Sequence, residues 1–192
     1  HGLFGKTTFL RGSGDVPLVM RFPDAIPLAH HALEIEAPVL TVDLHPTILE
    51  LAGLAPERDN DDLSLLLAVA TGQGFPGRIV CGEYGQGGET AMATDGHYKY
   101  VYYARGGIEH LFDVDKDPDD SINLARRPEY EGIKEALKAH LIAYLERFGR
   151  SMVANGALVV REAKLDEAYL RGQNYCAWRG PMRYGQGYGG GW

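Results

Sequence analysis

A lysine in the amino-terminal loop is the residue best suited to bind an anion. Lys6 follows Gly5 in the glycine-punctuated stretch at residues 1–6. The glycine would let a ligand approach the backbone closely, and the ammonium group of Lys6 would supply a point charge for sulfate or phosphate. Most loop lysines are simply solvated, so residue types alone leave both an anion contact and a surface role open for Lys6.

Three other clusters fit ordinary roles better than metal chemistry. His30 and His31 are adjacent in a loop, where neighbouring side chains rarely point the same way, which favours a surface role. The acidic run at residues 59–62 is typical of a solvated turn. Cys81 and Cys176 lie far apart and lack the spacing of metal ligands. Two reduced thiols are favoured over a disulfide, and neither state decides between cytoplasm and periplasm.

The composition argues against some classes of partner. The chain has 192 residues and a formal net charge of −7, with no basic patch that outweighs the acids. No apolar run approaches the roughly 20 residues that cross a bilayer. We therefore expect neither a nucleic acid nor a membrane as partner. The Gly- and aromatic-rich tail at residues 173–192 would line a substrate mouth or an oligomer contact, or be disordered, so a homo-oligomer stays open.

The elements that would position these residues begin with an α/β layer. The apolar run at residues 16–22 predicts a strand covered on both faces, as in a parallel sheet. A helix is predicted over residues 41–52, with Asp43 as its N-cap and Gly53 at its end. A single strand and helix cannot form a doubly covered sheet. We therefore expect this part to need partners from upstream in the same protein.

Beyond a Gly/Pro-rich linker at residues 72–77, the pattern changes to antiparallel β. Strands are predicted at residues 78–84, 89–94, 97–103 and 109–114, and Asp95-Gly96 predicts a type I′ turn between the middle pair. A long amphipathic helix follows, and its predicted buried stripe is Tyr130, Ile133, Leu137, Leu141, Tyr144 and Phe148. The predicted domains are thus residues 1–75, 76–150 and 151–192, the last a Gly- and aromatic-rich extension.

Four blocks of this sequence resemble sulfatases of the alkaline phosphatase superfamily. Residues 1–9, followed by the run at 16–21, are similar to a stretch of sulfatases and phosphonate monoester hydrolases that follows a metal-binding Asp-His-Gly segment. Residues 42–53 are similar to the helix after that strand. Residues 94–101 and 111–125 resemble a hairpin and turn of the C-terminal subdomain. The blocks occur in the family's order over residues 1–148, so the chain resembles the C-terminal portion of a sulfatase.

This resemblance implies a fold and a set of site residues. The fold would be α/β: the C-terminal part of an alkaline-phosphatase-like sandwich, plus a small subdomain in which an antiparallel sheet packs on a long helix. Lys6 matches the family lysine that contacts the sulfate group, where it would neutralise charge on the ester. His1 matches a histidine near the mouth of the site and would contact substrate or protonate the leaving group, or be a solvated chain end. His97 would contact substrate from the hairpin, or be an exposed hairpin residue.

The resemblance also implies chemistry that these residues do not supply. Sulfatases use a formylglycine made within a Cys/Ser-x-Pro-x-Arg motif, and neither Cys81 nor Cys176 lies in one. The divalent cation, usually Ca²⁺, is held by residues from earlier in the family's chain, so no metal ligand is predicted here. The intact protein, including its upstream part, would hydrolyse a small-molecule or carbohydrate sulfate ester, and this chain alone would be inactive. Two alternatives stay open: a phosphonate monoester or phosphodiester hydrolase of the same superfamily, and a non-catalytic interaction module.

Overall fold

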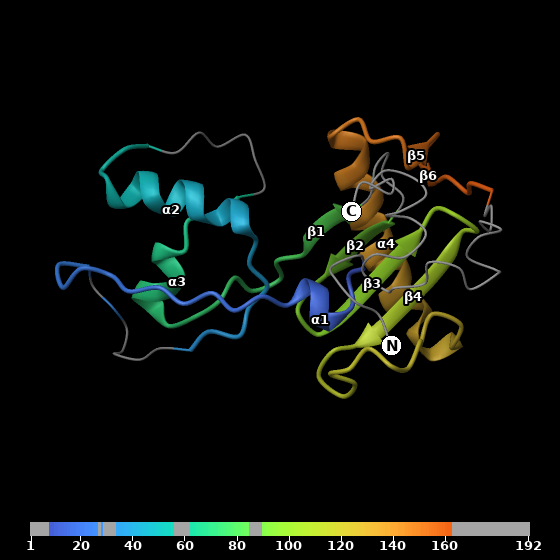
Figure 1. Ribbon diagram of the computed structural model, residues 1–192, viewed down its shortest axis with the longest axis horizontal. Coiled ribbons are helices and arrows are strands. Elements are labelled where there is room, and N and C mark those ends of the chain that lie inside the picture. Colours follow the sequence, from blue (N-terminus) through green and yellow to red (C-terminus); the bar gives the residue numbers. More distant parts are fainter. Residues whose placement is uncertain (1–7, 27, 29–33, 56–61, 85–89, 163–192) are drawn as a thin grey trace, which may run out of the picture. The chain divides into compact units, whose positions relative to one another are not determined.

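A computed structural model describes residues 8–26, 28, 34–55, 62–84 and 90–162 of the chain (Figure 1). These residues fall into two compact units. The sheet unit contains residues 8–16, 81–84, 90–93 and 97–162, and the helical unit contains residues 17–26, 28, 34–55, 62–80 and 94–96. No helix within these ranges is long and apolar enough to span a membrane. The predicted bounds 1–75, 76–150 and 151–192 stay predictions for the intact protein.

The helical unit contains the helix predicted over residues 41–52. A 3-10 turn, η1 (Thr41–Asp43), leads into α2 (Leu44–Leu51), and α3 (Leu66–Thr71) follows later in the chain. Asp43 precedes α2 as predicted, but its side chain makes no capping hydrogen bond to the helix. The carboxylate instead accepts the backbone N–H of Leu40, at 2.7 Å, and that of Leu63, at 2.9 Å. Asp43 therefore caps η1 through the Leu40 N–H and ties it to Leu63, rather than capping α2.

A buried ion pair completes this polar centre of the helical unit. Both terminal nitrogens of Arg78 donate to the two carboxylate oxygens of Asp43, at 2.8 and 2.7 Å. Thr47 donates to the Asp43 carbonyl oxygen at 2.6 Å and accepts the backbone N–H of Leu65 at 2.9 Å. Asp43 and Thr47 are fully buried. Charge-assisted bonds to Asp43 thus hold together segments that lie 20 and 35 positions away in the sequence.

The strand predicted at residues 16–22 is wrong for this structure. Residues 15–22 belong to no strand, and Val19 is 91% exposed. A strand exists through its hydrogen bonds to a neighbouring strand. The described part of the helical unit offers these residues no such neighbour, so their apolar character alone does not produce a sheet.

The sheet unit contains the four predicted strands in sequential order. They are β1 (Val80–Tyr84), β2 (Thr90–Thr94), β3 (Tyr98–Tyr103) and β4 (Ile108–Asp113). In the antiparallel pair β3–β4, Tyr98 lies opposite Asp113 and Tyr103 opposite Ile108. The Asp95-Gly96 turn is present, but of its two central residues only Gly96 has a positive φ, 97°. The turn is therefore not the predicted type I′, and residues 95–97 form a longer loop.

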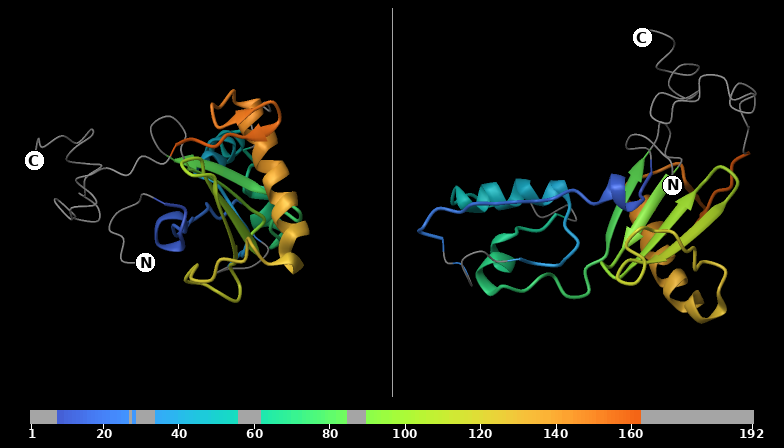
Figure 2. Two further views of the ribbon diagram at one scale, coloured as in Figure 1. Left: turned by 90° about the vertical axis from the view of Figure 1, so that its right-hand side faces the viewer. Right: turned by 60° about the horizontal axis from the view of Figure 1, so that its bottom comes forward.

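The long helix covers one face of this sheet. After the 3-10 turn η2 (Pro128–Tyr130), α4 (Glu131–Arg147) runs along the strands, and Figure 2 shows it on the face opposite the short helix α1 (Arg11–Gly14). The expected fold class, α/β with an antiparallel sheet packed on a long helix, is confirmed. The predicted stripe is rotated, however, because the buried residues of α4 are Lys134, Leu137, Leu141 and Leu145. Phe148, placed in the stripe, is 40% exposed.

A second, small hairpin follows α4 and was not predicted. Strands β5 (Val153–Ala154) and β6 (Ala157–Leu158) pair antiparallel. Asn155 and Gly156 between them both have positive φ, 53° and 74°, which is the geometry of a type I′ turn. The hairpin is tied to the sheet because the Tyr102 hydroxyl donates to the Val159 carbonyl oxygen at 2.8 Å.

Candidate functional site

The loop that carries Lys6 leads into a described segment, residues 8–14. His1 and Lys6 themselves lie outside the described residues. After Thr8, the Leu10 carbonyl oxygen accepts the N–H groups of Ser13 and Gly14, at 2.8 and 3.0 Å, which closes the single turn α1. The segment belongs to the sheet unit and lies on the sheet face opposite α4 (Figure 2).

An aromatic contact joins this segment to the sheet. The Phe9 ring lies so close to Gly82 of β1 that a Cβ at residue 82 would come within 3.3 Å of the ring atom Cε1. Real Cβ atoms rarely make so short a contact, and any side chain at residue 82 would displace the ring. The absence of a side chain at Gly82 therefore makes room for Phe9.

A buried ion pair forms the second attachment of the segment. The Lys99 ammonium group lies 2.6 Å from Oδ2 of Asp120, and the two side chains are 6% and 1% exposed. The same Oδ2 accepts the backbone N–H of Arg11 at 2.6 Å. The Arg11 guanidinium also donates to the Pro118 carbonyl oxygen at 3.3 Å. We call Lys99, Asp120 and the Arg11 amide the anchor.

The Asp120 carboxylate reaches the anchor from a tight turn. The Asp120 N–H donates to the Asp117 carbonyl oxygen at 3.0 Å, and the Asp117 side chain accepts the Ile122 N–H at 2.7 Å. Asp120 has a φ of 53°, which Asp tolerates better than most residues. Its second oxygen, Oδ1, is buried and has no hydrogen-bond partner in the part of the chain that the structure describes.

An aromatic cluster flanks the anchor. The His110 ring meets Tyr103 edge-on at 5.1 Å between centroids and Phe112 at 5.6 Å. The Lys99 ammonium group lies 5.9 Å from the centroid of Phe112, within reach of a cation–π attraction. Burial lowers the pKa of His110. Phe112 therefore contacts both the His110 ring and the Lys99 ammonium group.

His97, the predicted substrate contact of the hairpin, is paired with an aspartate. Its Nδ1 lies 2.8 Å from Oδ2 of Asp115, and the two side chains are 72% and 62% exposed. The His97 carbonyl oxygen accepts the Val114 N–H at 2.8 Å, which holds the two turns together. The carboxylate fixes the orientation of an imidazole that a ligand can reach.

The described residues do not form a metal centre. No group of three His, Cys, Asp or Glu side chains among them is arranged to hold an ion. His30, His31 and residues 59–61 lie outside the described residues. Asp62 is described and only 5% exposed, so it is not the solvated turn residue that was predicted. The described residues therefore offer no fitting set of ligands for the divalent cation implied by the family resemblance.

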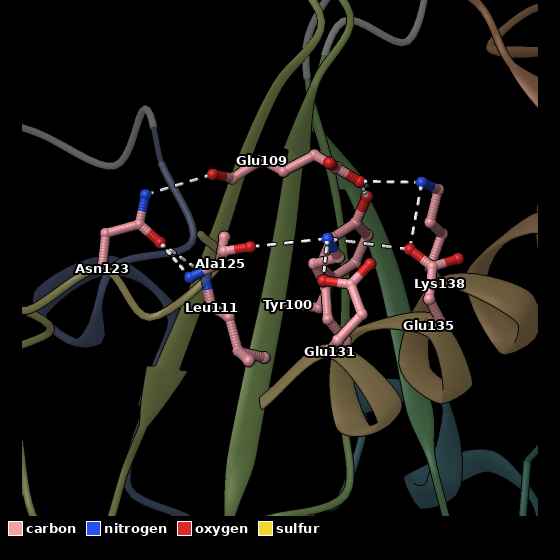
Figure 3. A network of polar contacts seen from close by, with 9 residues as sticks. Tyr100, Glu109, Leu111, Asn123, Ala125, Glu131, Glu135 and Lys138 are labelled. Carbon is pink, nitrogen blue, oxygen red and sulfur yellow. Dashed lines mark hydrogen bonds and ion pairs between the residues drawn. The ribbon is translucent and has the colours of Figure 1, made fainter. Parts of the chain in front are cut away.

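A separate polar network joins the sheet to α4 (Figure 3). The Tyr100 hydroxyl donates to Oε1 of Glu109 at 2.7 Å, and the Lys138 ammonium group lies 3.0 Å from the same oxygen. Burial raises the pKa of Glu109, but these two hydrogen bonds and the charges of Lys138 and Lys134 together bring the net pKa below the usual value. The Asn123 amide oxygen accepts the N–H groups of Leu111 and Ala125, both at 3.0 Å. This network serves the packing of the helix rather than a site.

The chain is similar in sequence to several sulfatases. A sulfatase of Formosa agariphila is 31% identical over 140 residues, which cover 73% of this chain and 26% of that protein. Arylsulfatase K of Xenopus laevis is 31% identical over 65% of this chain and 25% of its own length. This chain belongs to the sulfatase family. A solved 2-O GAG sulfatase is 31% identical over 55% of this chain and 24% of its own, with a TM-score of 0.47. No model of a protein family matches the sequence.

The chain spans about a quarter of the length of these relatives. The resemblance identified the family, but it did not single out Asp120 or Asp115. Asp120 contacts Lys99 and Arg11, which precede it by 21 and 109 positions in the sequence. A local sequence pattern does not predict contacts over such separations. Asp115 and Asp120 both lie in the block at residues 111–125, which resembled only a turn of the family's C-terminal subdomain.

Proposed function

We propose that the intact protein hydrolyses sulfate esters and that this chain forms part of its catalytic unit. The observation that carries the proposal is the 31% identity to a sulfatase over 140 residues. The formylglycine nucleophile and a divalent cation such as Ca²⁺ would be supplied by parts of the enzyme outside this chain. Alone, the 192-residue chain would be inactive.

Exposed apolar side chains in the helical unit support the need for such further parts. Val19, Ile48 and Leu67 are 91%, 61% and 68% exposed. Soluble proteins rarely leave large contiguous apolar surfaces uncovered. An upstream part of the same enzyme would cover them and would supply the strands that residues 16–22 lack.

Within this site we assign Lys6 to the sulfate group of the substrate. A lysine ammonium group beside the transferring group would neutralise charge that grows in the transition state. His1 would contact the ester or protonate the leaving oxygen. His97, oriented by Asp115 at 2.8 Å, would contact the rest of the substrate from the hairpin.

Relatives suggest which substrates to try first. One, from Bacteroides thetaiotaomicron, is 33% identical over 115 residues and is named a Delta 4,5-hexuronate-2-O-sulfatase. Another, from Rhizobium meliloti, is 32% identical over 133 residues and is named a choline-sulfatase. An unsaturated uronic acid 2-O-sulfate and choline sulfate therefore represent the carbohydrate and small-molecule classes.

Turnover by the intact protein tests the proposal. We expect hydrolysis of a sulfate monoester to exceed hydrolysis of the matching phosphonate monoester, and Lys6→Ala to lower kcat/KM by about 10²–10³-fold. The control Lys116→Ala removes an exposed lysine that pairs only locally with Asp113, and it should leave kcat/KM within about twofold. A preference for the phosphonate, or full activity in Lys6→Ala, would contradict the assignment.

The His97 assignment has its own test. His97→Ala should raise KM several-fold for a substrate with a large leaving group and less for a small one. Asp115→Asn should change KM in the same direction by a smaller factor. Because Asp115 would act only by orienting the imidazole, the double variant should match His97→Ala. Equal KM values in all four proteins would remove His97 from the site.

A further inference from the structure

We propose that Asp120 is a positioning residue for Lys6. Its buried carboxylate, held in place by Lys99, binds the backbone amide of Arg11 and thereby fixes the segment that leads out of the lysine loop. The inference rests on the proposed contact of Lys6 with the sulfate group. Asp120 would touch no substrate and would act only through the geometry of the chain that precedes Arg11.

The carboxylate is itself rigidly held. Its side chain is 1% exposed, and its Oδ2 lies 2.6 Å from the Lys99 ammonium group. Lys99 extends from β3, a central strand of the sheet, and lies near the Phe112 ring of β4. The backbone of Asp120 is closed into its turn by the hydrogen bond to Asp117. Because Lys99 holds its side chain and the turn holds its backbone, the Asp120 carboxylate is a well-positioned acceptor for the Arg11 N–H.

The amide that it binds lies close to the lysine in sequence. Arg11 N donates to Oδ2 at 2.6 Å, a short bond to a charged acceptor. Phe9, two residues earlier, lies against Gly82. Lys6 precedes Phe9 by only three residues in the sequence. Two attachments this near the lysine in sequence would restrict the positions open to its ammonium group.

One substitution removes the amide donor and leaves the carboxylate paired. Arg11→Pro removes the backbone N–H and the guanidinium group. Arg11→Ala removes the guanidinium group alone, so comparing the two variants tests the hydrogen bond from the residue 11 N–H to Asp120. Proline is tolerated at the first position of a helix, and Leu10, with φ −67° and ψ 154°, already has the conformation favoured before proline. Because Lys99 and Asp120 stay together, the protein should fold.

We expect kcat/KM of the intact protein for a sulfate ester to be at least tenfold lower in Arg11→Pro than in Arg11→Ala. Amide hydrogen exchange within residues 9–14 should be at least tenfold faster in Arg11→Pro than in Arg11→Ala, while exchange in α4 should be the same in both variants. In a Lys6→Ala background the two variants should differ by less than twofold in kcat/KM. A merely structural role would lower activity equally with and without the lysine.

A second pair addresses the carboxylate directly. Asp120→Asn should lower kcat/KM in the same direction, whereas Asp119→Asn, at the exposed neighbouring residue, should not. If Asp120→Asn does not fold, the comparison of Arg11→Pro with Arg11→Ala still tests the positioning role. If the wild type hydrolyses no sulfate ester, the proposed function fails and the positioning role with it. If the wild type is active and Arg11→Pro equals Arg11→Ala, only the positioning role is overturned.

Discussion

Replacing Tyr100 with phenylalanine should cost more stability than the same change at Tyr102, although both tyrosines lie on β3. The Tyr100 hydroxyl donates to the Glu109 carboxylate at 2.7 Å, and the Tyr102 hydroxyl donates to a neutral carbonyl, that of Val159, at 2.8 Å. Tyr100 and Tyr102 are 0% and 3% exposed. The two substitutions therefore compare a charged and a neutral acceptor under similar burial.

The expected magnitudes follow from the acceptors. A hydrogen bond to a charged group contributes about 1.5–3 kcal/mol, and one between neutral groups about 0.5–1.5 kcal/mol. In Tyr100→Phe the Glu109 carboxylate keeps Lys138 at 3.0 Å, so no buried charge is left alone. We expect a loss of about 2 kcal/mol for Tyr100→Phe and about 1 kcal/mol for Tyr102→Phe at pH 7.

The difference should shrink in acid. Burial raises the pKa of Glu109, yet the bonds from Tyr100 and Lys138, with the charges of nearby lysines, bring it below its usual value. A carboxyl group whose pKa is lowered on folding stabilises the protein above its unfolded pKa, and this contribution is lost as pH falls through the folded pKa. Burial and Glu109 raise the pKa of Tyr100, so its hydroxyl stays protonated and only Glu109 titrates. The cost of Tyr100→Phe should therefore fall between about pH 5 and pH 3.

Urea unfolding followed by circular dichroism at pH 7 and at pH 3 measures these quantities. Tyr84→Phe serves as the control, because Tyr84 is 41% exposed and its substitution should stay within about 0.5 kcal/mol of wild type. The reasoning would be refuted if Tyr102→Phe cost as much as Tyr100→Phe at pH 7, or if the cost of Tyr100→Phe were the same at both pH values.

Further predictions concern a buried charge and two glycines. Asp43→Asn should lower the stability of the helical unit by about 3–5 kcal/mol, because Arg78, 8% exposed, loses its carboxylate partner; faster hydrogen exchange in α2 would report it, and wild-type exchange would contradict it. Gly132→Ala in α4, where a Cβ meets nothing within 4 Å, should add about 0.5–1 kcal/mol. Gly149→Ala has equal space but a φ of +61° and should cost about 1–2 kcal/mol in the same urea assay.

Local signals predicted the sheet unit well. The four strands lie within two residues of their predicted ends, because alternation and turn residues act over a few positions. The predicted type I′ turn at Asp95-Gly96 is wrong, since Asp95 lacks a positive φ, and the turn of that geometry is at Asn155-Gly156. The latter signal was present in the sequence, but its flanking strands have two residues each, too few for an alternating pattern.

Periodicity did not decide which face of α4 is buried. The predicted stripe took in the aromatic residues Tyr144 and Phe148, whose rings form a tilted contact with 5.0 Å between their centroids. The buried residues instead include Lys134 and Leu145. Lys134 can be buried because its ammonium group lies 2.8 Å from Glu131, and a lysine stem covers apolar surface as well as a leucine does. When a helix carries a charged residue on its buried face, hydrophobic periodicity does not predict which face is buried.

The site could be predicted only in the parts that resemble a family. Lys6, His1 and His97 came from matched motifs, and their roles stay predictions. The strand at residues 16–22 was predicted from composition, but a strand depends on neighbours that composition does not contain. Asp120 could not be predicted at all, because its partners Lys99 and Arg11 come from distant parts of the sequence.

Asp43 and Asp120 perform the same physical task in the two units. Each is a buried carboxylate that faces one cation, Arg78 or Lys99. Asp43 accepts two backbone N–H groups and Asp120 accepts one, all from segments outside regular strands. Such amides must find partners when they leave water, and a carboxylate binds them more strongly than a carbonyl does. Removing two charges from water offsets much of this gain. Each carboxylate therefore contributes little net stability but favours one conformation of the loop that it binds. A functional site built on loops requires such a single conformation.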